Sequence, residues 1–220
     1  MMTTTPNRPI DMEQQLGRLG VVPVVVIDNE ADAVPLGRAL VAGGLPCAEI
    51  TLRTPAATAA IRHMAAACPE ILLGAGTVLT VAQAEEAVAA GAQFVVTPGF
   101  DTAVVTYCLS QNIPIIPGVM TPTEINMALS HGLRLLKFFP AEAAGGVRTL
   151  KAISAPYADV KFMPTGGITP ANLGDYLALT AVVACGGSWL ASHTLLAAGA
   201  YEEISALAGQ AVALGASRVL

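Results

Sequence analysis

The sequence is poor in charge, and the charge it has is dispersed. Charged residues make up 12% of the 220 residues and apolar residues 54%, which leaves ample material for a large core. The formal net charge is −5, and the lysines and arginines form no cluster. Proteins that bind nucleic acids or anionic membrane surfaces commonly carry a basic patch. We therefore expect neither nucleic acid nor membrane among the partners of this chain.

Long hydrophobic runs are also lacking, although the mean hydropathy is +0.61. Gly, Pro or a charged residue interrupts every apolar run well before the roughly 18 residues that a membrane-spanning helix needs. The first 15 residues contain neither the basic segment nor the continuous apolar stretch of a secretory signal. These features predict a cytoplasmic protein.

Cysteine pairs and histidine motifs with metal-binding spacing are absent. The four cysteines are Cys47, Cys68, Cys108 and Cys185. None belongs to a CxxC pair, so we expect reduced, buried thiols. The three histidines fall in segments with a helical or helix-edge pattern: His63, His131 and His193. Without HxH, HExxH or a carboxylate cluster, the sequence predicts neither a metal centre nor a cofactor.

What the chain does have is a repeating rhythm of short apolar runs and helix-length segments. Eight runs rich in Val, Ile and Leu span residues 21–27, 47–52, 71–75, 93–97, 113–118, 135–139, 160–165 and 181–186. Strands that alternate with helices are typical of βα units around a parallel sheet. Eight units in 220 residues give roughly 27 residues each, which suits a compact barrel. We predict an α/β fold with a single (β/α)8 TIM-barrel domain over residues 11–220, a loose tail at 1–10 and a capping helix at 11–19.

Helix-start signals support this assignment of strands and helices. Thr121, Pro122 and Glu124 supply an N-cap, a proline at the first helical position and a capping-box glutamate. Thr169 and Pro170 repeat the first two features. The doubly wound dinucleotide-binding fold is the main alternative, but the first predicted strand is not followed by a GxGxxG turn, and the later GAGTV is too short for one.

The position of one lysine indicates chemistry. Of the three lysines, Lys151 lies in an amphipathic stretch and Lys161 opens a strand, whereas Lys137 lies inside the apolar run LRLLKFFPAE. Strand alternation places it on one face with Leu135 and Phe139, so the amine is expected to point into the barrel. Desolvation there would disfavour the ammonium form and leave an amine able to attack a ketone and form a Schiff base. The alternative is a lysine whose stem packs while its head reaches solvent.

The second predicted strand carries possible partners for this lysine. In CAEITLRT, Glu49 and Arg53 lie an even number of positions from Cys47, so all three would point to the same face of the strand. We expect this face to be the barrel interior. Glu49 could move the protons that Schiff-base chemistry requires, and Arg53 could hold a substrate carboxylate. Thr77, after the third strand, could donate a hydroxyl. A structural Glu49–Arg53 ion pair and a helix-capping Thr77 are the alternatives.

Paired glycines end the last two predicted strands. Gly166 and Gly167 occur in PTGGI, and Gly186, Gly187 and Ser188 in CGGSWL. Glycine lets backbone N–H groups approach an anion closely, and the loops after strands seven and eight of this fold are a frequent phosphate site. A Gly-Gly pair alone usually marks a turn, so the indication comes from the two pairs together.

Six motifs occur in an order that resembles a known family. They are EITLRT, GAGTVL, QFVVTPG, LKFFPAE, PTGGI and GGSWL. From about residue 20 to beyond 190 the chain is similar to the bacterial 2-keto-3-deoxy-6-phosphogluconate (KDPG) aldolases, many of which also act on 4-hydroxy-2-oxoglutarate (KHG). One local departure is GVMTPTE, where other members read GISTxSE, and it bears on substrate preference.

The resemblance implies a homotrimeric class I aldolase that splits KDPG, a phosphorylated 2-keto sugar acid, into pyruvate and glyceraldehyde 3-phosphate. Lys137 would form the Schiff base and Glu49 would act as general acid and base. Arg53 and Thr77 would bind the pyruvyl carboxylate. The remaining pocket and phosphate contacts would be Pro98, Phe139, Gly166, Gly167 and Ser188, with Thr165 beside them.

Three other functional hypotheses stay open at this point. The sister aldolase for the galactonate epimer would keep Lys137 and Glu49 and differ at contacts such as Thr165. A phosphate-binding barrel isomerase or epimerase would need no Schiff-base lysine. A catalytically inactive barrel that only binds ligands is disfavoured, because Lys137, Glu49 and Arg53 are all present.

Overall fold

The computed structural model describes residues 11–216, so the tail predicted at 1–10 lies outside it. The strands are β1 (Val21–Val25), β2 (Cys47–Thr51), β3 (Leu72–Gly76), β4 (Phe94–Val96), β5 (Ile115–Ile116), β6 (Gly118–Val119), β7 (Leu135–Phe138), β8 (Lys161–Pro164) and β9 (Cys185–Gly187). The helices are α1 (Met12–Leu19), α2 (Ala33–Ala42), α3 (Ala57–Ala67), α4 (Val81–Ala89), α5 (Thr102–Ser110), α6 (Pro122–Ser130), α7 (Gly146–Ser154), α8 (Pro170–Leu177), α9 (His193–Ala197) and α10 (Tyr201–Ala216). Two short 3-10 turns, η1 (Glu30–Asp32) and η2 (Trp189–Ala191), complete the fold.

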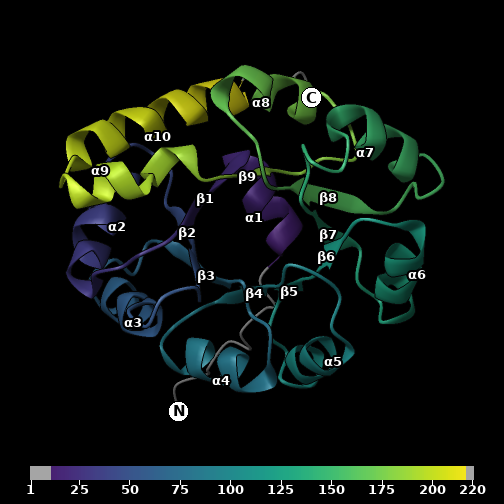
Figure 1. The fold of residues 1–220 in the computed structure, drawn as a ribbon, viewed down its shortest axis with the longest axis horizontal. Coiled ribbons are helices and arrows are strands. Elements are labelled where there is room, and N and C mark those ends of the chain that lie inside the picture. The colour runs from purple at the N-terminus through teal and green to yellow at the C-terminus, as the bar shows by residue number, and fades with distance from the viewer. Residues whose placement is uncertain (1–10, 217–220) are drawn as a thin grey trace, which may run out of the picture.

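The strands pair in parallel and in sequence order. One sheet has the order β5-β4-β3-β2-β1-β9 and the other the order β6-β7-β8. Two isolated bridges, Phe162 to Val182 and Thr165 to Gly186, connect the β8 segment to the β9 segment. The strands curl around a common centre with helices α2–α10 outside them (Figure 1). The chain is therefore an α/β protein built on a curled parallel sheet.

Two of the eight predicted strands differ from the observed ones. The run at 113–118 is divided into β5 and β6, because Pro117 has no N–H to donate to a ladder. The Pro117 carbonyl still accepts from the Lys137 N–H at 2.9 Å. Strand β7 therefore stays hydrogen-bonded to the chain at the interruption itself, as well as to β6. The run at 181–186 becomes a strand only at Cys185.

Buried side chains form two clusters, one on each side of the sheet. The larger one joins strand residues such as Ile50, Leu136 and Phe138 to the surrounding helices. The smaller inner cluster consists of Met12, Leu16, Val22, Cys47, Leu72, Phe94, Val96, Ile116, Met163, Val183 and Ala184. Strand alternation explains the division, because neighbouring residues point to opposite faces. All four cysteines are buried, as predicted.

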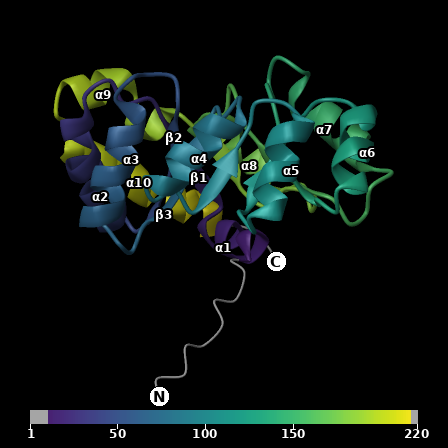
Figure 2. The same cartoon turned by 90° about the horizontal axis from the view of Figure 1, so that it is seen from below.

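Helix α1 agrees with the helix predicted at 11–19. Asp11 caps it by accepting from the Gln14 N–H at 3.0 Å, and Gly20 ends it in the left-handed conformation at φ 70°. Its Met12 and Leu16 side chains belong to the inner cluster. Figure 2 shows α1 on one side of the strands. Among residues 11–216, no helix has the length and apolar character needed to cross a membrane.

Candidate active site

Lys137 is a buried amine in the interior of β7. It is 4% exposed, and Gly118 of β6 and Met163 of β8 are its neighbours in the ladders. Its Nζ donates to Oε1 of Glu49 at 3.1 Å. Leu135 packs against the inner cluster, which confirms the predicted inward face of this strand. The alternative of a lysine that reaches solvent is therefore wrong.

Glu49 is the partner of this lysine and is fully buried in β2. Its Oε1 accepts from Lys137, whereas its Oε2 has no hydrogen-bond partner among the described residues. Gly76 of β3 leaves room for the carboxylate, because a Cβ at that position would lie 2.2 Å from Oε1. A buried carboxylate oxygen without a partner is destabilising, and such groups are concentrated where chemistry needs them. The predicted alternative of a Glu49–Arg53 ion pair is wrong.

A cavity of about 320 Å³ opens at the carboxyl ends of the strands. Its lining contains every residue predicted to contact substrate: Arg53, Thr77, Pro98, Phe139, Thr165, Gly166, Gly167 and Ser188. Lys137 and Glu49 do not line it, but the Lys137 Nζ is 5.3 Å from the centre of the Phe139 ring. The buried Lys137–Glu49 pair therefore lies close to a wall of the cavity in which the other predicted site residues meet.

Three further residues line this cavity and were not predicted: Val24, Val26 and Ile168. Gly186 of the second glycine pair lines it as well. In the sequence, Val24 and Val26 look like any other residues of an apolar strand. Their part in the cavity follows from the position of β1, and no motif marks them. Gly186 has a definite reason to be glycine, because a Cβ there would lie 2.3 Å from the Thr165 Oγ1.

Arg53 and Thr77 meet at one wall of the cavity. The Arg53 Nε donates to Oγ1 of Thr77 at 3.4 Å. Arg53 does not continue the β2 alternation as predicted, because β2 ends at Thr51 and the Arg53 N–H turns back to the Thr51 carbonyl at 2.8 Å. Thr77 has φ 58°, an uncommon left-handed conformation for a residue with a branched side chain. The helix-cap alternative for Thr77 is wrong, since Thr80 caps α4.

The glycine loop after β8 forms another wall. Gly166 and Gly167 have φ values of 101° and 80°, which side chains of L-residues rarely allow. Thr165, 6% exposed, precedes them and pairs with Gly186 across to β9. Ser188 follows β9 on the same rim.

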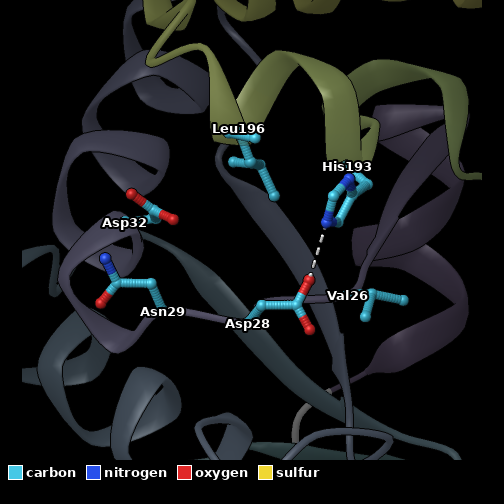
Figure 3. Close-up of a pocket in the computed structure, with 7 residues that line it drawn as sticks. Val26, Asp28, Asn29, Asp32, His193 and Leu196 are labelled. Carbon is cyan, nitrogen blue, oxygen red and sulfur yellow. Dashed lines mark ion pairs between the residues drawn. The ribbon is translucent and has the colours of Figure 1, made fainter.

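A second cavity of about 220 Å³ adjoins the first, with Val26 in both linings. His193 and Asp28 form an exposed ion pair over it, with Nε2 and Oδ2 3.2 Å apart (Figure 3). Asp32 accepts from the Tyr201 hydroxyl at 2.8 Å. Both carboxylates thus have partners within the chain. Across residues 11–216 no three His, Cys, Asp or Glu side chains are grouped as metal ligands.

Comparison with known proteins places these features in a family context. Residues 12–207 match the family described as KDPG and KHG aldolase. The chain is 50% identical to the 2-dehydro-3-deoxy-phosphogluconate aldolase of Treponema pallidum, over 91% of this chain and 96% of that protein. It is 49% identical to the KHG/KDPG aldolase of Escherichia coli K12, over 87% and 90%. A solved structure of KDPG aldolase from Legionella pneumophila, with pyruvate captured as a covalent carbinolamine, superposes with a TM-score of 0.87 at 41% identity, over 90% of this chain and 97% of that one.

Proposed function

Because the chain belongs to the KDPG and KHG aldolase family, we propose that it cleaves KDPG to pyruvate and glyceraldehyde 3-phosphate, and KHG to pyruvate and glyoxylate. It is a lyase that acts through a Schiff base. The buried Lys137–Glu49 pair beside the cavity carries this proposal, since it supplies a nucleophile and a proton carrier 3.1 Å apart. The carbinolamine seen in the Legionella pneumophila relative is the type of intermediate that such a pair would form.

Lys137 begins the reaction. A proton passed from its ammonium group to Glu49 leaves a neutral amine and a neutral acid. The amine attacks the C2 carbonyl of the substrate, and protonation of the resulting hydroxyl by Glu49 allows water to leave and an iminium to form.

Carbon–carbon cleavage then uses the same two residues. Glu49, now a carboxylate, takes the proton of the C4 hydroxyl while the C3–C4 bond breaks and its electrons move into the iminium. The aldehyde leaves, and Lys137 holds an enamine. Protonation of the enamine carbon and hydrolysis of the imine release pyruvate and restore the amine. Substrate groups or water would provide the hydrogen bond that Glu49 Oε2 lacks in the described chain.

The cavity walls would hold the two charged ends of the substrate. Arg53 and Thr77 bind the carboxylate next to C2, since a guanidinium fork matches a carboxylate in geometry and charge. Pro98 and Phe139 pack against the pyruvyl part. The phosphate lies against Gly166, Gly167 and Ser188, with Thr165 beside them, where glycine backbones allow close approach of N–H groups.

We infer that the curled sheet is a closed (β/α)8 barrel, with β5 and β6 as one strand interrupted at Pro117. Two observations support closure: β5 and β6 are consecutive in the chain, and bridges connect the β8 and β9 segments. The inner-cluster position of Met12 and Leu16 supports α1 as the cap of the opposite end. We also propose that residues 11–220 form one domain and that the enzyme is cytoplasmic. We propose further that it is a homotrimer, and light scattering of the purified protein tests this oligomeric state.

Borohydride trapping tests the proposed chemistry. Incubation with pyruvate and borohydride should add a reduced pyruvyl group to one lysine, and peptide mass spectrometry should place it on Lys137. A phosphate-binding isomerase or an inactive binding protein would give no adduct. Cleavage rates for KDPG, its galactonate epimer and KHG, measured side by side, then decide the preferred substrate.

A further inference from the structure

The proposed phosphate loop is supported from behind by a side chain with no part in the reaction described above. Glu142 follows β7, and its backbone N–H donates to the Gly166 carbonyl at 3.0 Å. Its side chain packs directly under the next residue, since a Cβ on Gly167 would lie 2.6 Å from both Cβ and Cγ of Glu142. Gly167 therefore has Glu142 in place of a side chain of its own.

A buried tyrosine holds this glutamate. Tyr176 of α8 is 0% exposed, and its hydroxyl donates to Oε1 of Glu142. The same oxygen lies 3.0 Å from the Cβ position of Gly146, the first residue of α7, where the helix dipole favours negative charge. Burial, and then the hydrogen bond to Glu142, raise the pKa of Tyr176 above its usual range, so the hydroxyl stays a donor. Figure 1 shows α7 and α8 as neighbours. The Glu142 carboxylate contacts Tyr176 of α8 and lies beside Gly146 at the start of α7.

A third contact completes the support of the loop. The Asn172 Nδ2 donates to the Gly167 carbonyl at 3.1 Å, while its Oδ1 accepts from the Thr169 N–H at 2.8 Å. Gly167 is thus held at its carbonyl by α8 and at its Cα by Glu142. Both contacts orient the peptide groups on either side of Gly167.

We propose that Glu142, anchored by Tyr176, is a positioning residue that shapes the Gly166–Gly167 loop for the phosphate of the substrate. The proposal rests on the phosphate position given under the proposed function. Glu142 does not touch the substrate. Its effect is on the affinity for a phosphorylated substrate, and the Lys137–Glu49 chemistry is independent of it. KHG carries no phosphate, so it measures the chemistry alone.

The test is a comparison of KM and kcat for KDPG and KHG in matched variants. Tyr176→Phe removes only the hydroxyl, and we expect the KM for KDPG to rise about three- to tenfold, the range of one lost hydrogen bond. The kcat for KDPG and both constants for KHG should stay within about twofold. Glu142→Ala should act in the same way, and Glu142→Gln, which keeps an acceptor for Tyr176, should behave like the wild type.

Tyr201→Phe is the matched control, because it removes a similar tyrosine–carboxylate bond, to Asp32, outside the site cavity. It should leave the ratio of the two KM values unchanged. Equal KM changes for both substrates in Tyr176→Phe and Glu142→Ala would overturn the proposal. Because Glu142 is exposed, Glu142→Ala can be tested even if Tyr176→Phe folds poorly. Gly167→Ala tests the phosphate site separately from the positioning role of Glu142. If it changes the ratio of the KM for KDPG to the KM for KHG and the Tyr176 and Glu142 variants do not, only the positioning role is wrong. If Gly167→Ala does not change this ratio, the proposed position of the phosphate is wrong as well.

Discussion

At the scale of single residues, the proposed chemistry depends on two side chains whose separate burial would be unfavourable. A lysine or a glutamate enclosed without a partner destabilises a protein by several kcal/mol. Lys137 and Glu49 meet this difficulty together, at 4% and 0% exposure and a separation of 3.1 Å. At this separation the two groups can exchange a proton without solvent, which is what the proposed mechanism requires of them.

Lys137→Met removes the amine and keeps much of the side-chain volume. We expect cleavage to fall by at least about 10³-fold, because no other described lysine is buried beside the cavity. Borohydride-dependent pyruvyl labelling should disappear, while circular dichroism stays that of the wild type. Lys151→Ala and Lys161→Ala are the controls and should retain full labelling. An adduct on Lys151 or Lys161 in the wild type would exclude the assigned mechanism.

Gly76→Ala tests the space that holds Glu49. The added methyl group would lie 2.2 Å from Glu49 Oε1, and since both residues are buried in neighbouring strands, the carboxylate must move away from Lys137. Displacement of a catalytic group by about 1 Å can lower the rate roughly 100-fold, and we expect kcat to fall by that order. Gly174→Ala, on the exposed face of α8 with no atom within 4 Å, should leave kcat unchanged. Normal activity in a folded Gly76→Ala enzyme would contradict the role given to Glu49.

At the scale of elements, local signals place the helices that follow the site strands. The capping box of α6 was predicted from Thr121 and Glu124, and it is confirmed by hydrogen bonds in both directions between them. Thr169 and Asn172 form the same arrangement at α8, although Asn replaces the usual Glu or Gln. These caps satisfy N–H groups at helix starts and so hold each loop where its strand ends.

Thr121→Ala should therefore lower stability more than activity. Loss of an N-cap hydroxyl destabilises a protein by about 1 kcal/mol, and the free energy of unfolding in urea should fall by that amount. Because Thr121 does not line the site cavity, kcat/KM for KDPG at 25 °C should remain near the wild-type value. Thr121→Ser, which keeps the hydroxyl, serves as control. A Thr121→Ala protein as stable as Thr121→Ser would show that the box contributes little.

At the scale of the whole molecule, two apolar clusters on opposite sides of the sheet enclose all four cysteine thiols. Burial raises the pKa of Cys108 to about 11, and burial together with Glu49 raises the pKa of Cys47 beyond that. Well below pH 9 these thiols are protonated in both the folded and the unfolded chain. They then have no effect on the pH dependence of stability.

Stability should decline as the pH rises above 9. The unfolded chain then loses thiol protons that the folded chain retains, so unfolding becomes more favourable, and the loss continues until the pH passes the folded pKa. Cys108 alone should remove on the order of 2 kcal/mol between pH 9 and pH 11. Urea unfolding at several alkaline pH values measures this decline, and Cys108→Ala should make it shallower. An equal slope in Cys108→Ala and wild type would rule out the thiol as its source.

Much of this molecule could be predicted from local patterns in the sequence. The alternation of apolar runs and helical segments predicted the α/β fold, and the parity of LLKF predicted that Lys137 faces inward. The capping box of Thr121 and Glu124 and the presence of glycines at two strand ends were equally visible. Each of these features depends on residues a few positions apart, and the chain itself sets their geometry.

The contacts of the site residues were settled only by the tertiary structure. The sequence left Glu49 two possible roles, a proton carrier beside Lys137 or an ion pair with Arg53 four positions away, and the fold brings it to Lys137, 88 positions away. Val24 and Val26 became cavity walls in the same way, and Gly76 and Gly186 proved necessary because side chains from neighbouring strands fill their space. Such contacts depend on which strands lie side by side and how far each is shifted, and no pattern within one strand specifies that.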